Sequence, residues 1–121
     1  MKRIMMHGKI HRATVTDANI DYVGSITLDP VLIELSGMLP FEQVHVVDID
    51  NGQRFQTYII EGDRDSGQVV LNGAAARLVQ KGDKVIVIAY AEMEDDEAQS
   101  LVPRVVLVDD SNRPITVAAD H

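Results

Sequence analysis

Residues 43–60 read QVHVVDIDNGQRFQTYII, two β-rich runs on either side of a short polar segment. The runs at 43–49 and 54–60 are rich in Val, Ile and aromatic residues, which are typical of strands. Between them, the sequence Asp-Asn-Gly at 50–52 predicts a type I′ turn with two consecutive positive φ angles. The stretch therefore predicts a β-hairpin, and with it a largely β fold.

Further strand patterns lie on both sides of the hairpin. Residues 84–91, KVIVIAYA, are almost continuously apolar and predict a strand in the centre of a sheet. Residues 17–19 are typical of a turn. The tail at 109–121 has no clear period, and we expect it to be frayed or packed on a neighbouring subunit. The other expected strands are 3–16, 68–71, 105–108 and a short one through Gly24 and Ser25.

Three segments favour short helices. Asp29 is a good N-cap, Pro30 suits the first helical position, and Gly37 is a typical stop. Residues 72–79 begin with Asn-Gly-Ala-Ala-Ala and predict a second helix. The acidic run at 92–97 predicts a third, continuing to residue 100. Six or seven short strands with these helices favour a small closed or nearly closed β-barrel, which hides strand edges.

The composition excludes several classes of function. The 121 residues suit a single domain, 1–121, and the absence of cysteine excludes thiol catalysis and disulfides. A net charge of −8 argues against a nucleic-acid partner. The first residues lack the apolar run of a signal peptide, and no stretch approaches the ~20 apolar residues of a membrane span. We therefore expect a soluble cytoplasmic protein with no nucleic-acid or membrane partner.

Gly24 and Ser25 form a pair that can make its own cofactor. The Ser25 hydroxyl can attack the Gly24 carbonyl and move the main chain onto oxygen as an ester. Elimination of that ester and hydrolysis then leave a pyruvoyl group. Glycine suits the upstream position because it has no Cβ to block the attack. Gly-Ser pairs are also common in ordinary loops, so the dipeptide alone does not decide the function.

Most familiar catalytic patterns are missing from the sequence. There is no G-x-S-x-G elbow around Ser25, no Walker loop and no G-x-G-x-x-G, and the spacing gives no support for a Ser-His-Asp triad. His7 and His11 have the spacing of a helical metal pair, but the segment favours a strand and no third ligand is near. We expect no metal there. Lys9 and His11 form either a solvated strand face or a cationic patch beside Ser25.

Five short blocks occur in order along the chain: GKIHR at 8–12, YVGS at 22–25, NGQRFQTY at 51–58, VLNGAAA at 70–76 and GDKVI at 82–86. Together they resemble the aspartate 1-decarboxylase family, small pyruvoyl-dependent enzymes that make β-alanine for pantothenate synthesis. The resemblance extends from residue 5 to about residue 103. It implies a small six-stranded double-psi β-barrel with a few short helices, assembled as a homotetramer with active sites between neighbouring subunits.

The resemblance also implies how the chain matures. Self-cleavage between Gly24 and Ser25 would give a β-chain, 1–24, and an α-chain, 25–121. The new N-terminus would carry the pyruvoyl group derived from Ser25, which forms a Schiff base with L-aspartate. Cleavage is either spontaneous or assisted by a maturation factor, which some family members use.

Within the resemblance, the polar positions of the blocks have expected roles. Lys9 and Arg54 hold the substrate carboxylates, and Tyr58, a phenol that is protonated at neutral pH, donates a proton after CO₂ is lost. Thr57 donates a hydrogen bond to the Gly24 carbonyl during cleavage and later contacts the substrate. Without the resemblance, the cations are ordinary surface charges and the tyrosine an ordinary strand aromatic. The remaining expected pocket residues are Asn72, Gly73, Ala74, Ala75, His11 and Tyr22.

Thr57 and Tyr58 conflict with a regular strand, because strand neighbours point to opposite faces. Both serve one site only if the strand is irregular there or the site lies at a subunit junction. Two other functions stay open on the residues alone. One is a non-catalytic β-barrel binding module in which residues 24–25 form an ordinary turn. The other is a metal-dependent enzyme that uses His7 and His11.

Overall fold

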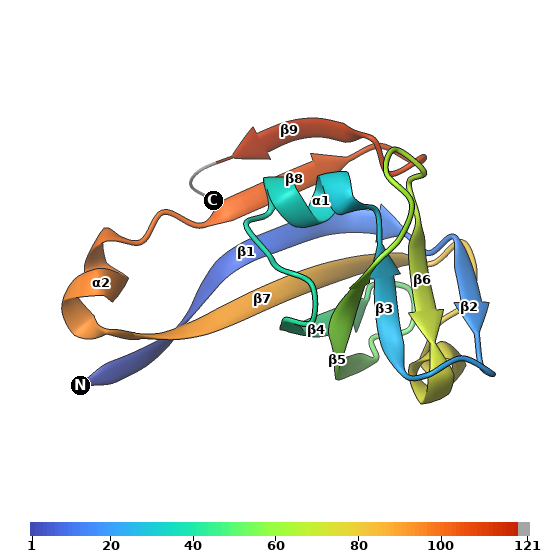
Figure 1. The fold of residues 1–121 in the computed structure, drawn as a ribbon, viewed down its shortest axis with the longest axis horizontal. Coiled ribbons are helices and arrows are strands. Elements are labelled where there is room, and N and C mark those ends of the chain that lie inside the picture. Colours follow the sequence, from blue (N-terminus) through green and yellow to red (C-terminus); the bar gives the residue numbers. More distant parts are fainter. Residues whose placement is uncertain (119–121) are drawn as a thin grey trace.

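The computed structural model describes residues 1–118, which form one sheet in the order β2-β6-β3-β5-β4-β7-β1-β8-β9 (Figure 1). The strands are β1 Lys2–Thr14, β2 Asp17–Asn19, β3 Ser25–Leu28, β4 Gln43–Asp48, β5 Arg54–Glu61, β6 Val69–Asn72, β7 Lys84–Glu94, β8 Arg104–Val108 and β9 Pro114–Ala118. The helices are α1 Pro30–Leu35, the 3₁₀-helix η1 Gly73–Leu78 and α2 Asp95–Ser100.

The mainly β fold with a few short helices is confirmed. Nine strands are assigned within residues 1–118, where the resemblance implies a barrel of six. In that part of the chain, the end strands β2 and β9 are not paired with each other. Closure into a double-psi barrel therefore stays a prediction.

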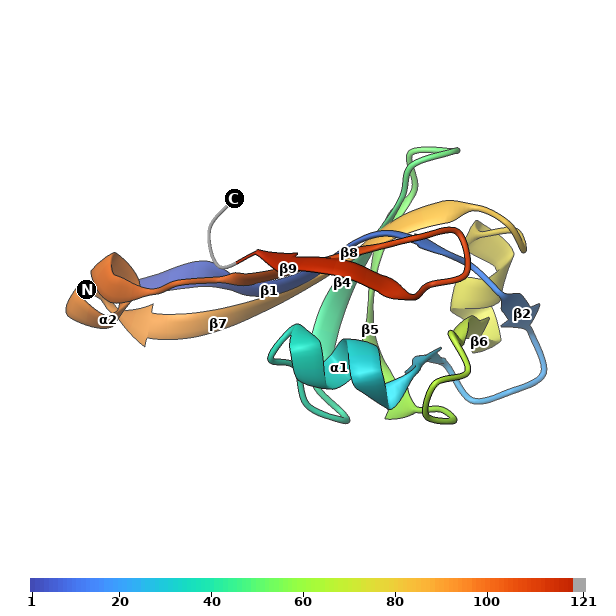
Figure 2. The same ribbon diagram turned by 90° about the horizontal axis from the view of Figure 1, so that it is seen from above.

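The long antiparallel pair β1–β7 forms the spine of the sheet, and β7 lies between β4 and β1 as its central position predicts. Figures 1 and 2 show that one end of this pair projects with α2 as an arm, away from the body that holds β2, β3 and β6. The register shifts between Met6 and Gly8, where a Cβ on Gly8 would come 2.2 Å from the carbonyl oxygen of Ser36. Glycine therefore lets the end of α1 approach β1 closely.

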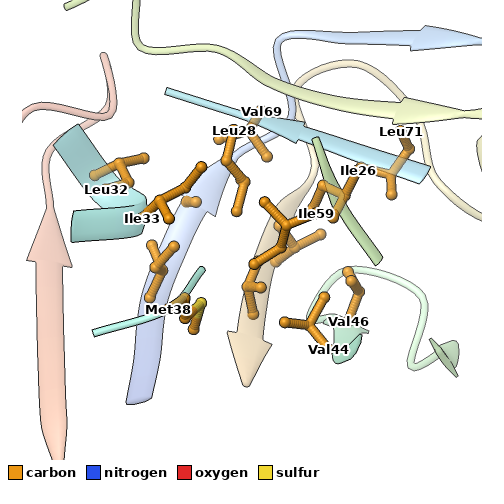
Figure 3. Packing of buried hydrophobic residues seen from close by; sticks show 14 of the residues in the cluster. Ile26, Leu28, Leu32, Ile33, Met38, Val44, Val46, Ile59, Val69 and Leu71 are labelled. Carbon is orange, nitrogen blue, oxygen red and sulfur yellow. The ribbon is translucent and has the colours of Figure 1, made fainter. Parts of the chain in front are cut away.

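The core lies against one face of the sheet, and buried side chains alternate with more exposed ones along β4 and the first part of β7. Figure 3 shows these side chains pointing toward one another from β3, β4, β5, β6 and α1. The labelled members of the cluster are Ile26, Leu28, Leu32, Ile33, Met38, Val44, Val46, Ile59, Val69 and Leu71. The alternation leaves the opposite face of the same strands free for polar residues.

Helix α1 forms as its end signals predict. The Asp29 carboxylate accepts a hydrogen bond from the N–H of Val31 at 2.9 Å, and Pro30 occupies the first turn. Gly37 has a φ of 73°, the left-handed conformation typical of a helix stop. The predicted helix after Asn72 is also present, as η1.

The segment Asp17–Asn19 is a strand, not the predicted turn. It pairs in parallel with residues 70–72 of β6, and the turn follows at 20–22. Asp and Asn are typical turn formers, but here long-range pairing with β6 decides the backbone conformation.

The hairpin of β4 and β5 is confirmed, but its predicted type I′ turn is wrong. The N–H of Asp48 donates to the carbonyl of Gln53, and the N–H of Gly52 donates to the carbonyl of Asp48, both at 2.9 Å. Within this wider loop only Gly52 has a positive φ, of 77°. The Asp48 carboxylate accepts the N–H groups of Asp50 and Asn51, which supports the longer loop.

The C-terminal part differs from prediction in two places. The acidic run starts inside β7, and the helix begins only at Asp95, after a capping box formed by Glu94 and Glu97. The tail, predicted to be frayed or packed on a neighbouring subunit, instead forms β9, which pairs antiparallel with β8. Residues 119–121 of that tail lie outside the described residues.

Replacing Ile59 tests the core. Ile59 is fully buried, so Ile59→Ala should lower the free energy of unfolding by about 2–5 kcal/mol through lost burial and a residual cavity. Urea unfolding at equal protein concentration measures this loss. The variant and the reference protein both carry Ser25→Ala, so that neither chain is cleaved. Ile115→Ala is the matched control, because Ile115 is 66% exposed and should change the free energy by less than about 0.5 kcal/mol. Equal losses in the two variants would contradict the assigned core.

Candidate active site

Ser25 begins β3, and its hydroxyl lies in a buried hydrogen-bond network. The Asn72 side-chain amide donates to the Ser25 Oγ at 2.9 Å and to the Thr27 Oγ1 at 3.0 Å. The Ser25 hydroxyl donates to the carbonyl of Val23 at 3.2 Å. Ser25 is 0% and Asn72 3% exposed. The network therefore holds a nucleophilic hydroxyl in a fixed position beside the Gly24–Ser25 bond.

The sheet pairings explain why these three side chains meet. Ser25 is paired with Asn72 across the antiparallel strands β3 and β6. Ser25 and Thr27 lie on one face of β3, because side chains two residues apart in a strand point the same way. Ile26 and Leu28 point to the other face and are fully buried in the core.

Gly73 brings the start of η1 against the cleavage segment. It has a φ of 67°, and a Cβ there would lie 2.6 Å from the Gly24 Cα and 2.7 Å from the Gly24 nitrogen. A Cβ on Gly24 itself would meet nothing within 4 Å beyond its chain neighbours. The close approach therefore depends on Gly73 rather than on Gly24.

Of the other expected pocket residues, Ala74 is exposed and Ala75 half-buried in η1, and Tyr22 is 51% exposed.

The parallel pairing of β3 with β5 begins with Ile26 opposite Ile59. Thr57 and Tyr58 directly precede the paired part of β5, as Gly24 and Ser25 precede that of β3. No register shift occurs along β5, so Thr57 and Tyr58 do point to opposite faces. Both line a hollow of about 380 Å³, together with Gln43 and Gln56.

Arg54 lies at the opposite end of β5 from the cleavage segment. Four residues separate it from Tyr58, about 13 Å along an extended strand. Its Nη2 donates to the Tyr90 hydroxyl at 3.0 Å and lies 3.3 Å from the His45 Nδ1. The rings of His45 and Tyr90 pack edge to face with centroids 4.9 Å apart. Arg54, which the sequence analysis expects to bind a substrate carboxylate, is thus positioned by the side chains of His45 and Tyr90.

Lys9 is on the same outer face of the sheet but on β1. It is paired with Ile88 of β7, and Ile88 is paired in turn with His45 of β4. Because β4 and β7 separate β1 from β5, Lys9 lies about 14 Å from β5. One chain therefore brings Ser25, Thr27 and Asn72 into contact, with Thr57 and Tyr58 on the neighbouring strand β5, but does not bring Lys9 and Arg54 to them.

The two histidines of β1 do not form a helical metal pair. β1 is extended through both, which separates them by about 13 Å along the strand. The His7 Nε2 instead lies 2.5 Å from a carboxylate oxygen of Glu42, while His11 is half-buried farther along the strand.

Four side chains around the site were not found by sequence reasoning. Thr27 has a signal in the sequence, because it follows Ser25 by two residues and so shares its face of the strand. His45, Tyr90 and Gln43 have none, because they reach the site only through the pairings of β4 with β5 and β7.

Within residues 1–118, no helix is long and apolar enough to cross a membrane.

Known proteins resemble this chain over most of its length. The family model described as aspartate decarboxylase matches residues 1–115. The chain is 56% identical to the aspartate 1-decarboxylase of Thermoanaerobacter pseudethanolicus, covering 97% of this chain and 100% of that protein. It is 60% identical to that of Clostridium beijerinckii, covering 89% and 87%, and 59% identical to that of Bacillus subtilis, covering 93% and 89%. The chain therefore belongs to the aspartate decarboxylase family.

Proposed function

We propose that this protein decarboxylates L-aspartate to β-alanine and CO₂ for pantothenate biosynthesis in the cytoplasm, using a pyruvoyl group made from Ser25. Family membership supports the reaction. The single observation that carries the role of Ser25 is its buried hydroxyl, held by the Asn72 amide at 2.9 Å next to Gly24. No comparable observation favours a binding module without catalysis.

Maturation starts with the Ser25 hydroxyl. Its oxygen attacks the Gly24 carbonyl carbon, the C–N bond between the two residues breaks, and the nitrogen takes the proton, which leaves an ester. Loss of the Ser25 α-proton then expels the Gly24 carboxylate. Water finally replaces the nitrogen, which leaves as ammonia. Asn72 orients the attacking oxygen, and Thr57 donates a hydrogen bond to the carbonyl oxygen as negative charge develops.

The residues around Ser25 fit a pyruvoyl group. Once the Ser25 oxygen has left with the Gly24 carboxylate, the Asn72 amide is free to donate to the carbonyl oxygen of the new group, and the Gly73 approach leaves the segment closely enclosed on one side. The pyruvoyl carbonyl supplies the electrophile that condenses with the substrate amine and accepts the electron pair released with CO₂. Tyr58, on the neighbouring strand, donates the proton that completes β-alanine.

Arg54 and Lys9 bind the substrate carboxylates from a neighbouring subunit. The backbone of each lies more than about 12 Å from Ser25 of its own chain along the sheet. The Arg54 Nη2 is directed at Tyr90 and His45, and the other N–H donors of the guanidinium group stay available for a bidentate grip. We place these contacts at the junctions of a homotetramer, where the negative net charge makes local cations necessary.

Self-cleavage gives a direct test. The mature protein should show two masses, one ending at Gly24 and one beginning at the modified Ser25, and borohydride should add to the new carbonyl. Ser25→Ala should stay a single chain and lose β-alanine formation, because no hydroxyl is present to attack. An unbroken chain that releases CO₂ from aspartate would contradict the role of Ser25, and an unbroken, inactive chain would favour the binding module. Cleavage only after addition of cell extract would indicate a maturation factor.

Gly73→Ala should slow cleavage at least tenfold, because its new Cβ would displace Gly24 from the hydroxyl. Timed mass spectra of freshly purified precursor measure the rate. Gly52→Ala is the matched control: Gly52 has a similar φ of 77°, but a Cβ there meets nothing within 4 Å. Equal slowing in both variants would assign the effect to backbone strain instead of to contact with Gly24.

Mixing two inactive variants tests the shared site. Ser25→Ala chains cannot form the pyruvoyl group, and Arg54→Ala chains lack the guanidinium group that binds a substrate carboxylate. Co-expression should restore about a quarter of wild-type activity, because that fraction of junctions pairs an intact Ser25 with an intact Arg54 of another chain. Purified variants mixed without subunit exchange serve as the control. Absence of recovery in co-assembled tetramers would place both residues in the same chain's site.

A further inference from the structure

Three aspartates converge at the loop end of the β4–β5 hairpin, and none of them has a role in the proposed reaction. Asp48 ends β4, Asp50 lies in the β4–β5 loop, and Asp83 precedes β7. One carboxylate oxygen from each lies within 4.8 Å of the others. This separation suits ligands that share one cation at the oxygen distances of calcium or magnesium.

Asp48 is buried, and one of its carboxylate oxygens has no hydrogen-bond partner within the described residues. It is 0% exposed, and its Oδ1 accepts the N–H groups of Asp50 and Asn51 at 2.8 and 3.2 Å. Its Oδ2 is buried and has no hydrogen-bond partner within residues 1–118. The side chain is therefore buried with one oxygen unsatisfied, a state that proteins avoid.

Backbone groups hold the other two carboxylates by one oxygen each. The N–H of Lys84 donates to the Asp50 Oδ2 at 2.8 Å, and the N–H of Gln80 donates to the Asp83 Oδ2 at 3.0 Å. The second oxygen of each accepts no hydrogen bond from the described residues. All three side chains are thus fixed by main-chain donors while one oxygen of each stays available for a ligand.

No side-chain cation of residues 1–118 forms an ion pair with the three carboxylates. The Lys84 ammonium group binds the Thr14 hydroxyl at 2.7 Å and the Asp110 carboxylate at 2.8 Å instead. A hollow of about 260 Å³, lined in part by Asp50, Asp83 and Arg77, opens beside them. The hollow gives a small ion access from solvent.

We propose that Asp48, Asp50 and Asp83 bind a hard divalent cation of the calcium and magnesium class. Three carboxylates, with water completing the shell, are the ligands such ions prefer. The ion joins the hairpin loop to the segment before β7, two parts of the chain far apart in sequence. It therefore stabilises the start of β5, the strand that carries Arg54, without taking part in the reaction.

Calcium binding to the full-length protein at pH 8 tests the proposal. With chelator-treated protein and Ca²⁺ as the probe, calorimetry should show one ion per chain, and thermal unfolding should shift to higher temperature with added Ca²⁺. Mg²⁺ in parallel reports the selectivity between the two ions. Asp48→Asn and Asp50→Asn should each weaken binding at least tenfold.

Asp63→Asn is the matched control, because Asp63 is exposed and its side chain lies outside the three-aspartate cluster. This variant loses the same charge and should bind Ca²⁺ as the wild type does. Two results overturn the proposal. One is a wild-type chain that binds neither ion at millimolar concentration, which would leave the three aspartates to share a proton. The other is binding that Asp48→Asn and Asp50→Asn reduce no more than Asp63→Asn does.

Discussion

The site depends on one side-chain amide, that of Asn72. Its amide donates to both the Ser25 hydroxyl and the Thr27 hydroxyl, and Ser25 and Asn72 are buried. A buried hydroxyl without such a partner would destabilise the fold by about 1–3 kcal/mol. The contact is possible because β3 pairs with β6 on one side and β5 on the other, so the same strand that buries Ile26 in the core presents Ser25 to Asn72.

The pairing of β3 with β5 bears on the conflict between Thr57 and Tyr58. The two side chains point to opposite faces of a regular strand, because β5 has no register shift in its pairing with β4. Both directly precede Ile59, the residue at which β5 begins to pair with β3. In the proposed mechanism each then has its own task, Thr57 at the carbonyl that is attacked and Tyr58 at the group that Ser25 becomes.

Local signals were enough to predict α1, the hairpin and the central position of β7, because caps, turns and apolar runs act over a few residues. They failed where distant segments decide the conformation. Residues 17–19 have turn-forming side chains but pair with β6, and residues 114–118 lack a period but complete the edge of β8. At the site, Ser25 and Asn72 lie in the sequence blocks that carry the family resemblance, 22–25 and 70–76. His45 and Tyr90 reach Arg54 only through strand pairings that no local pattern contains.

The placement of the cations is the strongest physical argument for a site shared between chains. Lys9 lies on β1 and Arg54 begins β5, with β4 and β7 between these two strands, whereas Ser25 begins β3 on the other side of β5. The fully buried residues Ile10 of β1, Val44 of β4 and Val87 of β7 hold this part of the sheet in register, and a slide of one residue would turn them to the opposite face. In the proposed homotetramer, the outer face of a neighbouring chain supplies the Lys9 and Arg54 that one chain does not bring to its own Ser25.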